Sequence, residues 1–445
     1  MTIDRPVFEA LADATCRIDG AEGLDCVSLS LAAESSDFLR FNRSALRQAT
    51  HVTQAYATLA VVRGARRAEA TLALCGDATR DLAQLQTERR RLAADLGTIP
   101  DDPWLLLPTT PRASERDDRG RLPEPAAVID AVRRHAAGHD LVGFLASGPV
   151  LRAYADSLGS RHWHRVENFH FDWCLYQRAD KAVKTAYAGT HWDEAVFEAR
   201  LAEAEARAEL LKRPARALPP GAYRTAFAPA AMHELLATLC WGGFGLKARR
   251  TGVSSLMALA HGDVALHPSV RLAEATARDL APTFTADGFV KPAEVLLVDG
   301  GKAAGTLNSP RSAREYGLAA NGATDAETPE SLELAPGAIP ADRLLEALGT
   351  GLYVSDLWYL NYSDRQACRM TGMTRFACFW VEGGRPVAPL DVMRFDDSFL
   401  RMFGEGLVGL SDHAERIPDG DSYQSRRLAS KATPAAIVDG WRLTL

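Results

Sequence analysis

The first third of the chain mixes two hydrophobic periods. Apolar residues at helical spacing favour amphipathic helices, and alternation of apolar with polar residues favours half-buried strands. On these patterns we expect helices over residues 7–14, 78–96 and 125–135. We expect strands that begin at Cys26 and cover 39–42, 53–62 and 68–74, forming a small antiparallel sheet. Residues 108–125 are rich in Pro, Arg, Asp and Ser, which predicts an exposed loop.

The clearest strand pair of the first half is predicted over residues 161–190, with a turn at 178–181. Successive side chains of a strand point to opposite faces. One predicted face therefore carries Phe169, Phe171, Trp173 and Leu175, and the other carries His170, Asp172, Cys174 and Tyr176. A charged helix over 192–211 follows this pair.

A Pro-rich stretch at 212–221 is the predicted domain boundary. It separates an N-terminal α/β domain, residues 1–211, from a β-rich C-terminal domain, residues 222–445. The second domain begins with a strand over 223–227 and a helix from Pro229, and later patterns predict strands and one further helix. These strands cover 294–299, 352–359, 374–381 and 386–390, and the helix covers 341–348. The predicted fold class is therefore α+β.

Composition narrows the function classes. The 445 residues are 47% hydrophobic and 24% charged, as in ordinary globular proteins. A net charge of -6 argues against direct nucleic-acid binding, which favours a basic face. No apolar run approaches the ~20 residues of a membrane span. The seven cysteines form no CxxC pair, and the first residues lack a signal-peptide pattern, so we expect a cytoplasmic protein.

The segment from Met232 to Thr238 begins like a zinc-protease helix, with His233 followed by Glu234. A zincin places its second histidine four residues after the first, so that both imidazoles share one helix face. That position is Ala237, so the motif is incomplete. The alternative is an ordinary amphipathic helix with His233 at the edge of its apolar face. We favour this alternative and predict no catalytic residue, with His233 and Glu234 as the weak candidates.

A second group of candidates lies on one face of the strand pair at period two: His162, His164, Asn168, His170 and Asp172. Histidines at this spacing can chelate a metal, but no third fixed ligand is apparent. The alternative is a polar face that meets a partner or a peptide, with His170 and Asp172 as its substrate-binding residues. His261 and His267 fit no ligand motif, and the glycines at 300–305 lack phosphate-loop order.

Four segments of the second half, in this order, resemble the TldD/PmbA family, whose members were once described as modulators of DNA gyrase. Residues 218–231 resemble the entry into the family's central helix, and 252–256 resemble the stretch that follows it. Residues 351–358 resemble its late strand. The hairpin of Phe379, Trp380, Val381 and Glu382, continued by Gly383, resembles the family's Phe-Trp-Ile-Glu-x-Gly hairpin.

The resemblance implies an N-terminal α/β domain followed by a mixed, barrel-like β domain. It also implies a two-chain zinc metallopeptidase that degrades or trims peptides. TldD-type chains carry His-Glu-x-x-x-His and a later cysteine as zinc ligands, and TldE-type (PmbA) chains lack them. Here Thr238 stands at the last histidine position, and no cysteine follows Cys378. The chain thus matches the TldE type, with no cofactor or metal site of its own and zinc in a TldD-type partner.

Two other functions stay open on the sequence. One is an independent metallohydrolase in which Glu234 acts as base and His233 shares the metal with a borrowed ligand. That ligand would come from His162, His164, His261 or His267. The other is a peptide-binding or protein-binding modulator without proteolysis.

Overall fold

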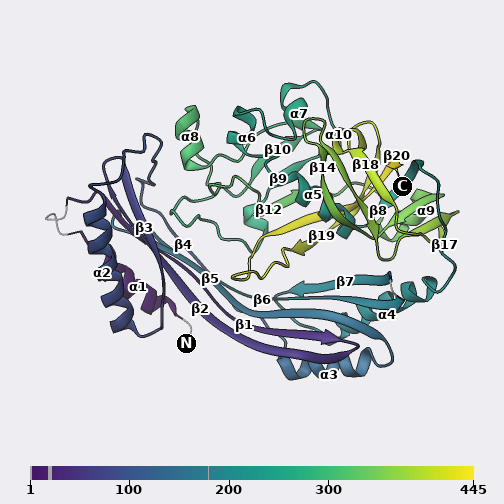
Figure 1. Cartoon of the computed structure of the whole chain (residues 1–445), viewed down its shortest axis with the longest axis horizontal. Coiled ribbons are helices and arrows are strands. Elements are labelled where there is room, and N and C mark those ends of the chain that lie inside the picture. Colours follow the sequence, from purple (N-terminus) through teal and green to yellow (C-terminus); the bar gives the residue numbers. More distant parts are fainter. Residues whose placement is uncertain (1–2, 19–22, 179, 445) are drawn as a thin grey trace.

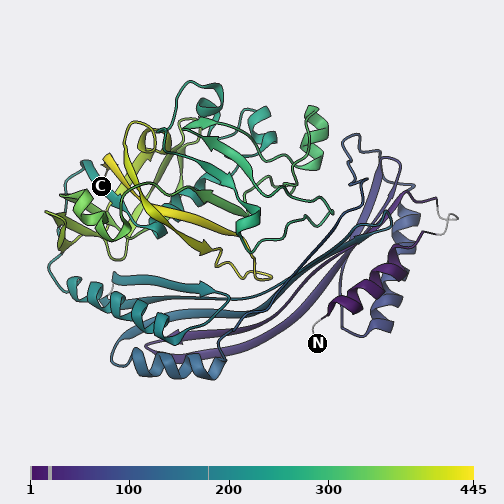
Figure 2. The same ribbon diagram turned by 180° about the vertical axis from the view of Figure 1, so that it is seen from behind.

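The computed structural model describes residues 3–18, 23–178 and 180–444. Its first half forms a long, strongly curved sheet, and the second half sits in the hollow of that curve (Figure 1). The view from behind shows the same relationship, with the second half facing one side of the sheet along much of its length (Figure 2). The fold is α+β, as predicted from the sequence.

The first sheet has seven strands in the order β3-β2-β1-β5-β6-β4, with β7 also paired to β6. All its pairings are antiparallel except β4 with β6. Four of the strands run for 17 to 19 residues, where strands of 3–10 residues are usual. The strands are β1 (Cys26–Asn42), β2 (Ala45–Arg63), β3 (Arg66–Ala73), β4 (Ala113–Asp118), β5 (Asp140–Asp156), β6 (Arg161–Arg178) and β7 (Lys181–Gly189).

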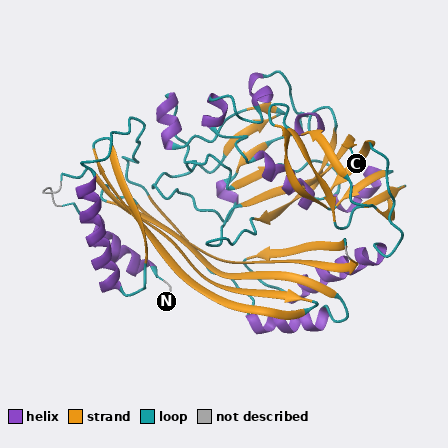
Figure 3. Ribbon diagram, in the orientation of Figure 1, coloured by secondary structure: helices purple, strands orange, loops and turns teal. Residues whose placement is uncertain are grey.

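Four helices cover the convex face of this sheet (Figure 3). The pair α1 and α2 packs on one end, against Leu29 and Leu31 of β1. The pair α3 and α4 packs on the other end, against Phe171 and Trp173 of β6. Both contacts use odd-numbered strand residues, so the even-numbered residues face the second half. The helices are α1 (Arg5–Cys16), α2 (Ala78–Asp95), α3 (Pro125–His135) and α4 (Glu194–Leu210).

Two expectations for the first half were wrong. Residues 39–42, predicted as a separate strand, are the end of β1. The sheet is also larger than predicted, because β5 pairs along almost the whole length of β1 and of β6. The predicted loop at 108–125 contains β4, which pairs in parallel with the start of β6. β4 lies at the edge of the sheet and alternates exposed with half-buried side chains, so it needs no apolar residues to form.

The second sheet has thirteen strands and is mixed. Its main path is β11-β10-β9-β12-β20-β8-β13-β16-β17, and β14, β15, β18 and β19 branch from it. Among the described residues these pairings form an open, branched sheet, so the expected barrel-like form is not a closed barrel. The strands are β8 (Gly221–Phe227), β9 (Leu272–Glu274), β10 (Val295–Asp299), β11 (Lys302–Ala303), β12 (Ser331–Leu334), β13 (Gly351–Val354), β14 (Asp356–Asp364), β15 (Arg369–Arg375), β16 (Phe379–Glu382), β17 (Arg385–Pro389), β18 (Arg394–Ser398), β19 (Leu407–Pro418) and β20 (Ser430–Leu443).

Two predicted strands of the second half are each divided. The strand expected over 374–381 breaks at Phe376, whose φ of 62° lies in the left-handed region that an aromatic residue rarely adopts. The strand expected over 352–359 breaks at Ser355, where the chain leaves β8 and β16 and turns to β15. Each break changes the pairing partner, which a hydrophobic pattern does not record.

The core of the second half surrounds α5 (Pro229–Leu239). Its predicted apolar face is confirmed, since Met232, Leu235, Leu236 and Leu239 are fully buried. The other helices are short: α6 (Leu246–Arg250), α7 (Met257–His261), α8 (Pro310–Tyr316), α9 (Leu344–Leu348), α10 (Phe399–Met402) and the 3-10 turns Thr276–Arg278 and Ala341–Arg343. Within the described part of the chain, no helix combines the length and the apolar character that crossing a membrane requires.

Candidate functional site

A cavity of about 450 Å³ lies between the two halves, where β6 and β7 face α5. We call it the central cavity. Four residues singled out from the sequence line it together: His170 and Asp172 from β6, and His233 and Glu234 from α5. The sequence placed these pairs in different elements and gave no reason to join them. The fold brings them into one site.

The even face of β6 explains why only two of its five polar candidates reach the central cavity. His162 stacks on Phe284 of the second half with ring centroids 4.8 Å apart. The Nε2 of His164 lies 3.0 Å from the Leu280 carbonyl oxygen, and burial lowers the pKa of this imidazole to about 4. These histidines therefore pack between the two halves of the chain and do not form a metal site with His170.

His233 and Glu234 project from the first turns of α5 into the central cavity. Burial, together with the nearby positive charges of Lys431 and Lys184, lowers the pKa of His233 to about 3. The imidazole is therefore neutral at physiological pH. Its Nδ1 atom is buried and has no hydrogen-bond partner in the structure as described. Burial raises the pKa of Glu234, and the same two lysines oppose that rise.

Thr238 shows that α5 does not fit a zinc centre. It stands at the last position of the His-Glu-x-x-x-His pattern, and a threonine hydroxyl is not among the usual protein ligands of zinc. Thr238 is 2% exposed, and its hydroxyl donates a 3.0 Å hydrogen bond to the carbonyl of Glu234. Across residues 3–18, 23–178 and 180–444, no three His, Cys, Asp or Glu side chains gather closely enough to hold a metal ion. No zinc-dependent step is therefore assigned to this helix.

The remaining histidines considered as borrowed ligands lie elsewhere. The Nδ1 of His261 is 3.8 Å from a carboxylate oxygen of Asp263, and both side chains are largely exposed. The Nδ1 of His267 is 2.8 Å from the hydroxyl of Ser269. Neither residue lines the central cavity.

Other residues of the cavity wall were missed from the sequence. Asp356 is only 5% exposed, and burial raises the pKa of its carboxyl group to about 6, with Lys184 opposing. A carboxylate inside the apolar strand predicted at 352–359 was the one signal that could have identified it. Lys184 of β7 is exposed on the opposite wall, and nothing in its surroundings along the sequence distinguishes it.

The loop between β19 and β20, residues 419–429, forms a further wall of the central cavity. Asp419 and Gly420 line the cavity, while Arg426 reaches into the first sheet. Nη1 of Arg426 donates to the Gly148 carbonyl at 3.0 Å, and Nη2 donates to the Asn168 carbonyl at 3.0 Å. Arg426 is 5% exposed, and burial lowers its pKa to about 10, so the guanidinium stays charged at neutral pH. The loop is thus fixed to both halves.

The floor of the central cavity includes an open strand edge. Among the described strands, β7 pairs with β6 alone. The carbonyl of Ala186 accepts a 2.7 Å hydrogen bond from Arg200, so Ala186 directs its backbone groups away from β6. Because hydrogen-bonded and non-bonded positions alternate in antiparallel strands, Lys184 and Ala188 direct theirs the same way. Of these three residues, Lys184 and Ala186 line the cavity, so its wall offers the backbone groups of Lys184 beside neutral and charged side chains.

Solved structures with the same fold span the whole chain at low sequence identity. TldE from Thermococcus kodakarensis has a TM-score of 0.78 and 12% identity, over 99% of this chain and 100% of that chain. A candidate modulator of a DNA gyrase from Thermotoga maritima has a TM-score of 0.78 and 13% identity, over 98% and 100%. Another from Bacteroides thetaiotaomicron has a TM-score of 0.75 and 13% identity, over 100% of both. At such identities the likeness establishes the fold.

The sequence itself supplies the family. No curated protein matches the chain. Residues 220–444, however, match the family profile described as the PmbA/TldA metallopeptidase C-terminal domain. This match takes in half of the chain and includes α5 and the second sheet. The protein therefore belongs to the TldD/PmbA family of metallopeptidase-type proteins.

Proposed function

We propose that this chain is the non-catalytic, TldE-type subunit of a two-chain TldD/TldE zinc metallopeptidase that degrades or trims peptides. The observation that carries the proposal is α5, where His233 and Glu234 face the central cavity and Thr238 is buried in place of a second histidine. The likeness to a solved TldE over the whole chain supports the same assignment. The partner would be a TldD-type chain that holds the zinc.

The role of this subunit would be to hold an extended peptide. A peptide that adds a strand to an exposed sheet edge gains affinity from backbone hydrogen bonds, and neighbouring side chains select among sequences. The edge of β7 at Lys184 supplies such backbone groups. His170 and Asp172 lie on the adjacent strand of the same wall. We place the pair of subunits in the cytoplasm, where the seven free cysteines would stay reduced.

The experiment that tests this proposal measures zinc content and peptidase activity of the purified chain, alone and after addition of a TldD-type chain. We expect no stoichiometric zinc and no cleavage from the chain alone, and cleavage from the pair. The matched variants are His233→Ala and His267→Ala, the latter altering a histidine outside the cavity. One zinc per chain, lost together with activity in His233→Ala but not in His267→Ala, would make the chain an independent metallohydrolase and overturn the proposal.

A further inference from the structure

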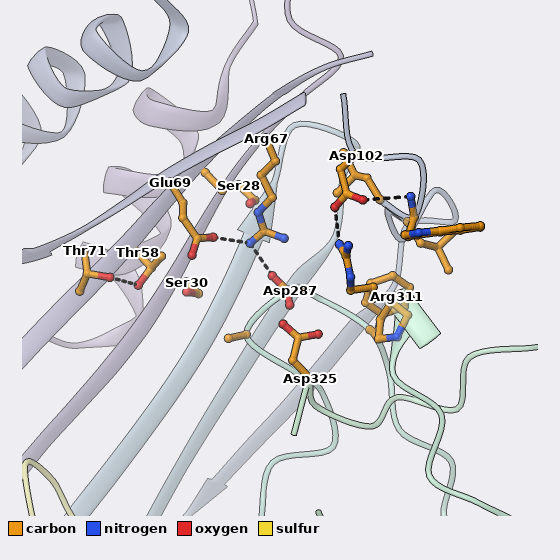
Figure 4. A pocket seen from close by; sticks show the side chains of 17 residues that line it. Ser28, Ser30, Thr58, Arg67, Glu69, Thr71, Asp102, Asp287, Arg311 and Asp325 are labelled. Carbon is orange, nitrogen blue, oxygen red and sulfur yellow. Dashed lines mark hydrogen bonds and ion pairs between the residues drawn. The ribbon is translucent and has the colours of Figure 1, made fainter. Parts of the chain in front are cut away.

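A second cavity of about 620 Å³ lies nearer the other end of the long strands. We call it the strand-face cavity (Figure 4). Its first wall is the face of β1, β2 and β3 that carries Ser30, Thr58 and Arg67. Its second wall comes from loops of the other half, which contribute Asp287 and Asp325. Cavities of 300–1,000 Å³ between domains are common small-ligand sites.

Two ion pairs join the walls of the strand-face cavity. Nη2 of Arg67 lies 2.5 Å from a carboxylate oxygen of Asp287 and 2.8 Å from one of Glu69. Arg311, at the start of α8, pairs with Asp102. Three carboxylates are thus matched by two guanidinium groups within the cavity itself.

Asp325 is the carboxylate left over. It makes no hydrogen bond or ion pair with any described residue, and its side chain is exposed on the cavity wall. Figure 4 shows its carboxyl group beside that of Asp287, with no interaction drawn to it. Partial desolvation raises the pKa of Asp325 and the negative charge of Asp287 raises it further, while the positive charges of Arg67 and Arg311 oppose the rise. The lining therefore carries four carboxylates against two guanidinium groups and favours a positively charged occupant.

The rest of the lining combines hydroxyl groups with an apolar wall. The hydroxyls of Thr58 and Thr71 bond to each other at 2.8 Å, and Ser30 lies beside them on the sheet face. Across the cavity, Trp104 and Leu106 present apolar surface, and Trp104 is 36% exposed. An aromatic face attracts a cation, and an aliphatic stem can pack on the same surface.

We propose that the strand-face cavity binds a primary ammonium group on an aliphatic stem, anchored by Asp325. An ammonium is a compact charge with three donors, so it can bond to Asp325, to a second carboxylate and to a strand hydroxyl together. The stem would lie against Trp104 and Leu106. A lysine side chain of a bound peptide and a free diamine share this chemistry. The inference is independent of the peptidase role proposed for the central cavity.

The test is titration calorimetry of the full-length chain with two probes. One probe is 1,5-diaminopentane, and the other is a capped pentapeptide with one central lysine. We expect saturable binding of at least one probe and at least tenfold weaker binding in Asp325→Asn. Asp299→Asn, which removes an exposed carboxylate at the end of β10, should bind as the wild type does. Tighter binding of the diamine would assign a free amine as the ligand, and tighter binding of the peptide would assign a lysine side chain.

A second variant distinguishes loss of binding from a folding defect in Asp325→Asn. Trp104→Ala truncates a partly exposed side chain and should weaken the same probe threefold or more, with the unfolding transition unchanged. Acetylation of the peptide's lysine should abolish its binding. Absence of saturable binding to the wild type, or wild-type affinity in both Asp325→Asn and Trp104→Ala, would overturn the proposal.

Discussion

Gly420 and His170 approach so closely that only glycine leaves the imidazole undisturbed. A Cβ atom on Gly420 would lie 3.0 Å from Cε1 and 3.4 Å from Nδ1 of the His170 ring. The first distance is shorter than carbon atoms in packed interiors normally adopt. A side chain at position 420 would therefore require the His170 ring or the loop to shift by a few tenths of an ångström.

Gly420→Ala tests this relationship. The added methyl group must displace either the loop or the His170 ring, and overpacking of this kind costs about 1 kcal/mol or more. We expect a lower free energy of unfolding in urea and a displaced loop. Gly97→Ala is the control, because its Cβ would meet only the Ala94 carbonyl oxygen at 3.8 Å. Equal stability of the two variants would show that the loop is not held by close packing.

Arg426→Met should release the loop from the first sheet. The substitution leaves the carbonyls of Gly148 and Asn168 without their charged donor, and losing one member of a buried charged network costs about 3 kcal/mol. Urea unfolding measures this loss, and hydrogen exchange over residues 419–429 should become faster. Arg427→Met, which removes a largely exposed arginine 3.7 Å from Asp421, should change stability by less than about 0.5 kcal/mol. Slow exchange in Arg426→Met would contradict the assigned role.

The raised pKa of Asp356 predicts that the free energy of unfolding depends on pH with a definite sign. Burial raises its pKa to about 6 in the folded chain, above the ordinary value near 3.9 for an unfolded chain. The folded state thus binds this proton more tightly, so the stabilisation is complete below about pH 4 and is lost as the pH rises to about 6. The loss amounts to about 3 kcal/mol.

Asp356→Asn removes this titration. We expect the variant to gain stability relative to the wild type as the pH rises from about 4 to about 6, by urea unfolding at each pH. Asp263→Asn, at an exposed position, is the control and should follow the wild type. A wild-type pH profile in Asp356→Asn would show that this carboxyl group ionises normally.

His170→Ala and Asp172→Ala should each weaken peptide binding to the central cavity. Both side chains line the wall next to the open edge of β7, and loss of one hydrogen bond to a charged or polar group costs about 1–3 kcal/mol. That cost corresponds to roughly fivefold to 150-fold weaker affinity, measurable with a labelled peptide. His261→Ala and Asp263→Ala change an exposed pair outside the cavity and should bind as the wild type does. Unchanged affinity in both cavity variants would remove these residues from the peptide site.

The sequence predicts the local elements of this protein better than their extent. Helices such as α2 and α3 and the facing of β6 follow directly from hydrophobic period, because each depends on residues close in the chain. β4 escapes the pattern because it is a polar edge strand. The breaks at Ser355 and Phe376 escape it because they are changes of pairing partner between distant segments.

The residues of the candidate site could be predicted from the sequence, but their meeting in one cavity could not. His170, Asp172, His233 and Glu234 were identified from spacing or motif, each within its own element. Their meeting depends on how the second half docks against the even face of β6, which no local pattern encodes. Asp356 becomes notable only when its burial is known.

The clamp at Arg426 also bears on how the chain reaches its final form. Its backbone amide donates to the carboxylate of Glu34 across 392 positions of sequence. A contact between segments so far apart in sequence can form only after both segments have been synthesised. During synthesis from the N-terminus, β6 is made before residues 419–429, so the central cavity lacks this wall until the loop has been made. Ligand binding at the central cavity would therefore require that residues 419–429 have been synthesised and have docked, and a chain ending before residue 419 would lack this wall of the site.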